Sequence, residues 1–188
     1  MYSSKKALRE TMLKTRDSFS KKILDKMSEM IQDRVLNMNE FVGAKTVAAY
    51  CSIGSEVKTS KILTMVLQMK KKLALPKVND DTEIVLVAVQ NLQNELEVGN
   101  YNIMEPKNHC VKINKIDLVL VPGIAWDEHG HRLGYSKGYY DRYLAGQQTT
   151  SVGLAYDFQL LEDIPHGKND FRVNLIVTEK RIIKAFDS

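Results

Sequence analysis

Asp117-Leu-Val-Leu-Val-Pro122 is the stretch on which the fold prediction rests, because it is the most hydrophobic strand candidate in the chain. Leu and Val side chains without a polar interruption, enclosed by an aspartate and a proline, predict a short strand buried on both faces. Strands of this kind are typical of the centre of a mostly parallel sheet. Pro122-Gly123 ends the strand and begins a loop.

The segments before this strand predict opening helices followed by alternating elements. Apolar side chains at near-helical spacing favour a helix over residues 5–19 and a second helix from Ser20. Thr59 is a candidate cap for a third helix that runs to about residue 71. Short runs rich in β-branched and aliphatic residues predict strands at 46–50, 73–78 and 84–89.

The segments after the strand continue the alternation. Tyr139 to Leu144 has the pattern of a helix start, and residues 90–111 are poorly patterned and predict a loop. Further strands are expected at 151–156, 173–178 and 181–186. Helices that alternate with hydrophobic strands indicate an α/β protein, here a three-layer α/β/α sandwich with a mostly parallel central sheet.

Length and composition exclude several classes of protein. A chain of 188 residues with 44% hydrophobic content predicts one domain over residues 1–188. Cys51 and Cys110 lack the dense spacing of a disulfide scaffold, and the opening residues contain no apolar run typical of a signal peptide. Because no stretch approaches the roughly 20 apolar residues that cross a bilayer, no membrane association is expected. We expect a cytoplasmic monomer with reduced thiols.

The net charge of +4 is concentrated at the start of the chain. Residues 1–36 hold nine Lys or Arg against five Asp or Glu, and the remainder holds 18 of each. Acidic residues interspersed on a helix are more typical of a solvated face than of a nucleic-acid surface. The sequence therefore favours a small polyanion as partner, and no nucleic acid is expected.

The segment Gly130-His-Arg-Leu-Gly-Tyr-Ser-Lys-Gly-Tyr-Tyr-Asp141 carries the candidate chemistry. Its glycines permit close backbone approach to a ligand, Arg132 and Lys137 can neutralise phosphate oxygens, and Asp141 can hold a divalent cation. The segment follows the carboxyl end of a central strand and leads into a helix N-terminus, where anions bind in α/β proteins. This position favours phosphate.

Short motifs leave two other classes of function open. The P-loop and the dinucleotide fingerprint do not fit the order of glycines here, and the histidines and cysteines lack zinc spacing. Gly134-Tyr-Ser-Lys-Gly138 matches the nucleophile elbow of serine hydrolases, with Asp157 or Asp163 and His166 downstream. The apolar strand ends more than ten residues before Ser136, which weighs against a hydrolase. A non-catalytic binder of nucleotide or of another small polyanion is the second alternative.

A much longer pattern resembles a known family. Residues 117–143, from Asp117-Leu-Val-Leu-Val-Pro-Gly to Gly138-Tyr-Tyr-Asp-Arg-Tyr143, resemble the signature of 5-formyltetrahydrofolate cyclo-ligase, also called methenyltetrahydrofolate synthetase. Other family marks occur in the same order at Lys5-Lys-Ala-Leu-Arg9, Tyr50-Cys-Ser-Ile-Gly-Ser-Glu56, Leu75-Pro-Lys77, Tyr101-Asn-Ile-Met-Glu-Pro106 and Asp170. The resemblance spans essentially the whole chain.

This resemblance implies a fold and a reaction. The fold is Rossmann-like. The enzymes of the family convert 5-formyltetrahydrofolate and ATP into 5,10-methenyltetrahydrofolate, ADP and phosphate, with Mg2+ as cofactor. The formyl oxygen attacks the γ-phosphate to give an iminophosphate, N10 then closes the ring, and phosphate leaves. Phosphoryl transfer needs positioning and charge stabilisation more than a protein nucleophile, which agrees with the residue types of the glycine-rich segment.

The resemblance also implies roles for individual residues. The ATP-binding residues are Lys5, Lys6, Arg9, Lys77, Arg132, Leu133, Gly134, Tyr135, Ser136, Lys137, Gly138, Tyr139 and Tyr140. The folate-binding residues are Cys51, Glu56, Tyr101, Gly134, Tyr135, Ser136, Lys137 and Gly138, and polyglutamylated folate is included as a partner. Arg132 and Lys137 are the expected catalytic residues, and Asp141 and Asp170 the expected magnesium ligands.

Some of these residues have a simpler structural interpretation, and others differ from the residue that the family usually has. Lys5 and Arg9 have the spacing of solvated cations on a helix, and Cys51 suits a small buried apolar position. Ser136 stands where the family has a glycine; if that position has positive φ, the serine costs on the order of 1 kcal/mol. Lys77 replaces a common arginine, which exchanges a planar fork for a point charge.

Overall fold

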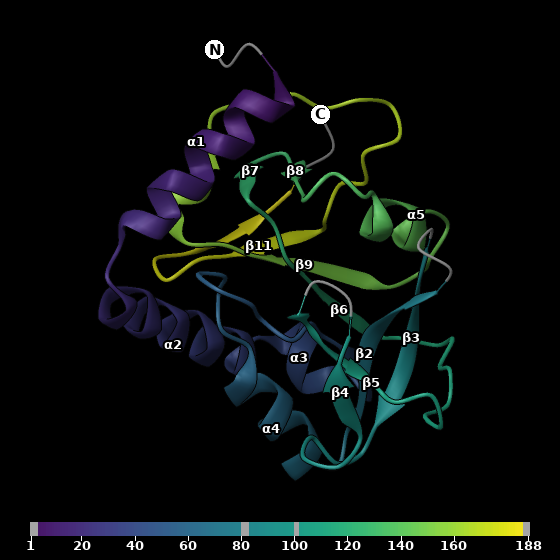
Figure 1. The fold of residues 1–188 in the computed structure, drawn as a ribbon. Coiled ribbons are helices and arrows are strands. Elements are labelled where there is room, and N and C mark those ends of the chain that lie inside the picture. Colours follow the sequence, from purple (N-terminus) through teal and green to yellow (C-terminus); the bar gives the residue numbers. More distant parts are fainter. Residues whose placement is uncertain (1–3, 80–82, 100–101, 186–188) are drawn as a thin grey trace.

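The computed structural model describes residues 4–79, 83–99 and 102–185 (Figure 1). The α-helices are α1 (Lys5–Ser18), α2 (Lys21–Asn37), α3 (Asn39–Gly43), α4 (Ser60–Gln68) and α5 (Tyr139–Leu144). Strands of the central sheet are β1 (Thr46–Ala48), β2 (Lys72–Asn79), β3 (Glu83–Val89), β6 (Leu118–Val121), β9 (Thr150–Leu154), β11 (Leu175–Val177) and β12 (Ile182–Lys184). No described helix has the length and apolarity that a bilayer crossing requires.

The central sheet has seven strands in the order β12-β11-β9-β6-β1-β2-β3. The five strands from β11 to β2 pair in parallel, while β12 and β3 pair antiparallel at the two edges. The predicted strand 117–122 is β6, which lies in the middle of the order with parallel partners on both sides. The prediction of a mostly parallel α/β sheet is confirmed.

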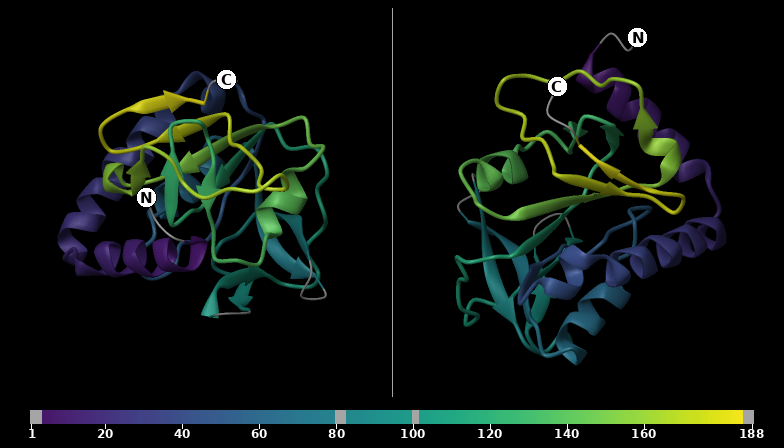
Figure 2. Two further views of the ribbon diagram at one scale, coloured as in Figure 1. Left: turned by 90° about the horizontal axis from the view of Figure 1, so that it is seen from above. Right: turned by 180° about the vertical axis from the view of Figure 1, so that it is seen from behind.

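Side chains along β6 alternate between two hydrophobic layers. Leu118 and Leu120 pack in the layer formed with α2, α3 and α4, and Val119 and Val121 pack in the layer that contains Leu144 of α5. This follows from the period of two residues in a strand. Figure 2 shows α2 and α4 together on one side of the molecule and α5 on the other. The arrangement is the predicted three-layer sandwich.

The layer beneath α5 is built around Trp126 of β7 (Ala125–Asp127). Its indole is fully buried, as expected of a packing residue. A Cβ atom placed on Gly153 would lie 2.4 Å from the indole Cη2, and one on Gly123 would lie 2.5 Å from Cζ2. The indole therefore occupies the space that side chains at these two positions would need.

A three-stranded sheet that the sequence did not predict lies next to the central one. It has the order β10-β7-β8, with β8 at Arg132–Leu133 and β10 at Leu160–Leu161, directly after the 3-10 turn Asp157–Gln159. Its core contains Leu133 together with Leu8 and Met12 of α1. This small sheet fixes the beginning of the glycine-rich segment against the first helix.

Two predictions of local structure are wrong. Residues 90–111 are not a loop throughout, because β4 (Leu96–Val98) and β5 (Met104–Pro106) form an antiparallel hairpin. Each strand is only three residues long, which is too short for a recognisable pattern of alternation, and backbone pairing holds the two together. Thr59 occupies the N-cap position of α4, but its hydroxyl donates to the carbonyl of Tyr50 at 2.6 Å and makes no capping bond to the helix.

Candidate active site

The glycine-rich segment lies beyond the carboxyl end of β6. The chain leaves β6 at Val121, forms β7 and β8, and passes through residues 134–138 into α5. Helix α1 packs against β7, at the same end of the molecule as β8 (Figure 1). Ligands of open α/β sheets bind at this edge.

The loop between β8 and α5 contains two residues with left-handed backbone conformation, separated by a single residue. Ser136 has φ of +79° and Gly138 has φ of +65°, the latter at the N-cap of α5. Ser136 therefore has the positive φ at which a serine is unfavourable, and it carries a strain on the order of 1 kcal/mol that a glycine would not. The loop holds a conformation suited to the usual family glycine.

Helix α1 supplies cations to this loop and to a neighbouring loop. Arg9 donates from Nε to the carbonyl of Gly134 at 2.9 Å. Lys5 forms an ion pair with Asp170, whose Oδ2 also accepts the backbone N–H of Gly167 at 2.7 Å. Partial burial favours a higher pKa for Asp170, but the bonds from Lys5 and Gly167 outweigh it, and the pKa is lowered. Lys6 is exposed on the same helix.

Arg132 of β8 and Asp141 of α5 form a mostly buried ion pair. Arg132 Nη1 lies 3.0 Å from Asp141 Oδ1, and the Arg132 side chain is 4% exposed. The guanidinium lies 5.8 Å from the ring centroid of Tyr140. Although the carboxylate is close, Nη1 has no well-directed hydrogen bond among the described residues. It is a buried donor that an anionic ligand could satisfy.

The two predicted magnesium ligands lie near each other. Asp141 Oδ1 accepts the backbone N–H of Phe171 at 3.0 Å, and Phe171 follows Asp170 in the chain. The charge of Arg132 also acts on Asp170. Among residues 4–79, 83–99 and 102–185, no group of three or more His, Cys, Asp or Glu side chains could hold a metal ion. Two carboxylates suit a hard cation that takes its other oxygen ligands from water and phosphate.

Glu56 and Cys51 lie at the other end of the same region. Glu56 is 6% exposed and accepts the backbone N–H of Ile53 at Oε2 (2.9 Å). Burial raises the pKa of Glu56, although bonds from Ile53 and Tyr135 act in the opposite direction. Burial also raises the pKa of Cys51 to about 11, so its thiol stays protonated at neutral pH. Both side chains act electrostatically on Tyr140, which connects this end to Arg132.

Three other predicted residues are placed by different contacts. Lys77 donates to the carbonyl of Pro106 at 2.6 Å and so contacts the β4–β5 hairpin. The Leu133 side chain is 2% exposed and belongs to the core beneath α1, which leaves only its backbone near the loop. The Tyr139 ring lies 5.6 Å from the Arg142 guanidinium. Tyr101 falls outside the described residues.

Sequence reasoning missed Arg16, which is 4% exposed. Its Nε donates to Ser55 Oγ and its Nη2 to the Tyr135 hydroxyl, both at 2.9 Å. One signal could have identified it, because Leu8, Met12 and Arg16 follow each other at intervals of four residues and all three are buried. A cation on the apolar stripe of a helix indicates a buried partner.

The geometry of a serine hydrolase is not assembled. Five residues separate the end of β8 from α5, whereas an elbow turns sharply from strand to helix at the serine. The Asp157 carboxylate is engaged by Lys180 at 2.9 Å and by Thr178 at 3.2 Å. The His166 ring stacks on His131 at 3.7 Å between centroids. Asp157, one of the two candidate acids, is thus bound elsewhere than at the candidate base His166, and Asp163, the other, is exposed.

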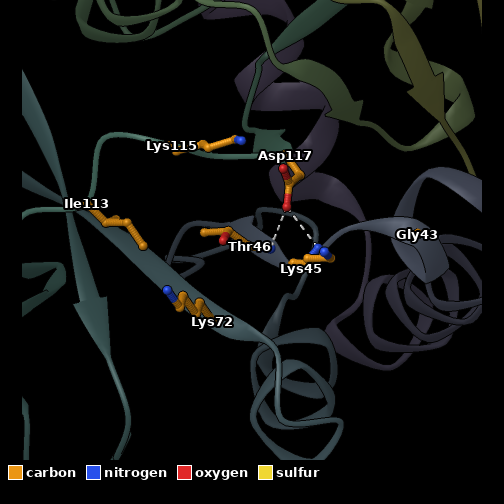
Figure 3. Close-up of a pocket in the computed structure, with 7 residues that line it drawn as sticks. All are labelled: Gly43, Lys45, Thr46, Lys72, Ile113, Lys115 and Asp117. Atoms are coloured by element: carbon orange, nitrogen blue, oxygen red, sulfur yellow. Dashed lines mark hydrogen bonds between the residues drawn. The ribbon is translucent and has the colours of Figure 1, made fainter.

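A surface hollow of about 440 Å³ lies at the opposite, amino edge of the central sheet (Figure 3). The chain enters β1, β2 and β6 here, and Asp117 accepts the backbone N–H groups of Lys45 and Thr46 at 2.9 Å each. The hollow is lined by Gly43, Lys45, Thr46, Lys72, Ile113, Lys115 and Asp117. None of these is among the predicted site residues.

The fold and the carboxyl-edge site define a Rossmann-like α/β protein with a glycine-rich loop that cations of α1 and β8 border. Comparison with known proteins makes the assignment specific. Residues 1–179 match the 5-formyltetrahydrofolate cyclo-ligase family, and the chain belongs to that family.

Individual relatives agree along most of the chain. The mitochondrial 5-formyltetrahydrofolate cyclo-ligase of Arabidopsis thaliana is 31% identical over 97% of this chain and 76% of its own length. The cyclo-ligase of Escherichia coli K12 is 29% identical over 83% of this chain and 90% of its own. The NMR structure of 5,10-methenyltetrahydrofolate synthetase from Aquifex aeolicus superposes with a TM-score of 0.88 at 38% identity, covering 98% of this chain and 94% of that one.

Proposed function

We propose that the protein is an ATP- and Mg2+-dependent ligase that converts 5-formyltetrahydrofolate into 5,10-methenyltetrahydrofolate. Membership of the family and the names of its relatives support cyclo-ligase activity. One observation of the structure carries the extension to ATP: cations of α1 meet the glycine-rich loop, as in the bond from Arg9 Nε to the Gly134 carbonyl. Basic side chains beside a loop of this kind favour a polyphosphate.

The assigned phosphate contacts come from three elements. Lys5, Lys6 and Arg9 lie on α1, Arg132 on β8, and Lys137 in the loop. Lys5 is paired with Asp170 and Arg132 with Asp141, so these charges are already compensated before a nucleotide binds. Phosphate oxygens would compete for the two cations and leave the two carboxylates available for a cation of their own. Nη1 of Arg132 has no well-directed hydrogen bond among the described residues, so a phosphate oxygen would supply one.

The reaction needs no nucleophile from the protein. The formyl oxygen attacks the γ-phosphorus and the bond to ADP breaks. N10 then attacks the formyl carbon and loses its proton, and the formyl oxygen departs with inorganic phosphate. Arg132 and Lys137 stabilise the charge on the transferring phosphoryl group, and the loop orients the formyl oxygen towards it. Preorganised charge in a partly buried site acts more strongly than in water.

Asp141 and Asp170 are the residues that would hold magnesium. Bound there, the ion would neutralise charge on the β- and γ-phosphate oxygens. The role of Asp170 depends on release from Lys5, to which it is paired. At the other end, the Glu56 carboxylate would accept hydrogen bonds from the pterin, and the Cys51 side chain would supply a mainly apolar contact.

The expected partners are small molecules, namely ATP and 5-formyltetrahydrofolate with or without additional glutamates. We further propose that the protein acts as a single-domain monomer in the cytoplasm. The Lys77 contact with the β4–β5 hairpin leaves its proposed role at the nucleotide to be tested by substitution.

Purified protein with ATP, Mg2+ and 5-formyltetrahydrofolate should develop the absorbance of the methenyl product. ADP should accumulate in equal amount, and both signals should require folate and metal. If ATP is not consumed in a folate-dependent way, the proposed reaction is wrong. Calorimetry on the same sample separates the remaining alternative, because a non-catalytic binder would show heat of binding without product.

A further inference from the structure

We propose that Arg16 is a positioning residue for the folate end of the site. It fastens the glycine-rich loop, through Tyr135, to the turn that carries Glu56. The inference rests on the proposed function, because Glu56 is assigned there to the folate. Arg16 touches neither assigned substrate, so its effect would pass through Tyr135 and Glu56.

Three segments remote in sequence meet at the Arg16 guanidinium. Nε donates to Ser55 Oγ and Nη2 donates to the Tyr135 hydroxyl, both at 2.9 Å. These partners lie 39 and 119 positions from Arg16 in the chain. Ser55 in turn donates to Asp17, so its hydroxyl accepts from one residue of α1 and donates to the next. The contact joins helix, turn and loop at one point.

The Tyr135 hydroxyl extends this contact to Glu56. It accepts from Arg16, and it lies close enough to the Glu56 carboxylate that each group shifts the pKa of the other. The other Glu56 contact, from the backbone N–H of Ile53, lies within its own turn. Tyr135 is therefore the bridge between a buried cation and a buried carboxylate. This fixes the direction in which Glu56 presents its remaining oxygen lone pairs.

The burial of Arg16 indicates that its partners matter. A guanidinium that is 4% exposed loses its hydration, and only well-directed acceptors offset that loss. Seven residues earlier on the same helix, Arg9 binds the Gly134 carbonyl, next to Tyr135. Helix α1 therefore holds the loop at two adjacent residues, one towards the proposed nucleotide end and one towards the proposed folate end.

The charge of Arg16 also acts on the titration of Glu56. Burial raises the pKa of Glu56, while Arg16 and Lys58 lower it. The other titratable groups facing Glu56 are the hydroxyls of Tyr50, Tyr135 and Tyr140, each of which interacts electrostatically with it. Removal of the Arg16 charge should therefore raise the pKa of Glu56 further. The carboxylate would then be lost at a higher pH during acidification.

The test compares Arg16→Gln and Tyr135→Phe with Lys14→Gln, which removes the same charge from an exposed position of α1. We expect Arg16→Gln to raise the KM for 5-formyltetrahydrofolate about tenfold, the effect of leaving a buried hydrogen-bonding group unsatisfied. The KM for ATP should change less, and the acidic limb of kcat/KM for folate should move to higher pH. Lys14→Gln should match the unmodified protein in all three measurements.

Two further variants separate positioning from stability. Arg16→Lys keeps the charge and loses the fork, so the pH limb should return towards its original position while the folate KM stays raised. Tyr135→Phe removes the hydroxyl that accepts from Arg16 but leaves the Arg16 charge in place. If both residues act through the same contact, the effects of Tyr135→Phe and Arg16→Gln on the folate KM should not add in the double variant. Thermal unfolding of each variant identifies any that fail to fold.

The outcomes also separate this inference from the proposed function. If the unmodified protein neither forms product nor binds 5-formyltetrahydrofolate in calorimetry, both are wrong. If it forms product and folded Arg16→Gln and Tyr135→Phe retain the folate KM and pH limb of Lys14→Gln, only the role of Arg16 is overturned. Reduced stability with unchanged KM and pH profile would likewise leave Arg16 a purely structural residue.

Discussion

The two edges of the central sheet are both basic, but their cations differ in burial and in the contacts they make. At the carboxyl edge, Arg16 and Arg132 are buried and contact groups from distant segments. At the amino edge, Lys45, Lys72 and Lys115 are exposed around the hollow of Figure 3. The hollow of Figure 3 thus coincides with exposed cations, whereas the two buried arginines lie at the other edge.

The difference shows that positive charge indicates a site only together with burial and long-range contacts. An exposed lysine keeps its hydration and costs little wherever it lies. A buried arginine must be compensated, and its compensating groups belong to other elements: Tyr135 for Arg16, and Asp141 for Arg132. The aspartates differ in the same way. The Asp117 carboxylate accepts the backbone N–H groups of Lys45 and Thr46, whereas Asp141 pairs with a side-chain cation.

The largest expected effect comes from matched substitutions at the two edges. Lys137→Ala and Asp141→Ala at the carboxyl edge should each reduce kcat by at least about a hundredfold, the usual loss when a preorganised charge contact is removed. Lys115→Ala and Asp117→Ala at the amino edge should leave kcat within about twofold. The measurement is formation of methenyl product at saturating ATP and folate.

This comparison would fail in either of two ways. Near-normal rates for both carboxyl-edge variants would remove the basis of the site assignment. A large loss for Lys115→Ala, with the fold intact by circular dichroism, would instead connect the hollow of Figure 3 to activity and reverse the contrast between the edges.

The central sheet could be predicted because its strands carry a strong local signal. β6 is a run of Leu and Val, and β1, β2, β9 and β11 have similar short buried runs. The strands of the small sheet could not be predicted in this way. β8 is two residues long, and β10 pairs with β7 although Leu160 and Trp126 are separated by more than thirty positions. The tertiary contacts, rather than local patterns, create these strands.

From the residues alone, the candidate site could be predicted only where its residues lie together in the sequence. The glycine-rich segment stood out by composition, and resemblance to a family identified the remaining candidates. Neither source predicts the pair between Lys5 and Asp170, which are separated by 165 positions. Neither predicts that Lys77 contacts the β4–β5 hairpin through the Pro106 carbonyl. Contacts of this range depend on how the layers pack.

A smaller effect should distinguish Asp117 as a structural group. Its pKa is lowered by hydrogen bonds from the N–H groups of Thr46 and Lys45. Since the folded-state pKa is depressed, the stabilisation is present above the unfolded value and disappears as pH falls through the folded one. Asp117→Ala should lower the free energy of unfolding by about 1 kcal/mol at pH 7. Urea denaturation should show the difference shrinking below pH 3.8; a constant difference would contradict an ionised acceptor.

The smallest expected effect is on stability, and it concerns one residue with left-handed backbone strain near each edge of the sheet. Ser136 in the loop has φ of +79°, and Lys70, which lines a hollow with Lys72 away from the loop, has φ of +55°. Glycine relieves left-handed strain but loses more entropy on folding, so Ser136→Gly and Lys70→Gly should each stabilise the protein by at most about 1 kcal/mol. Denaturant midpoints measure this gain.

Turnover then separates the two glycine variants. Lys70→Gly should leave kcat unchanged, because Lys70 lies outside the proposed site. Ser136→Gly should retain or raise kcat, because the loop would need no strained serine to surround the phosphates and the reaction uses no protein nucleophile. Complete loss of activity in Ser136→Gly, with Lys70→Gly unaffected, would instead assign chemistry to the Ser136 hydroxyl. That result would favour the hydrolase alternative, even though Asp157 is bound to Lys180 and the His166 ring stacks on His131.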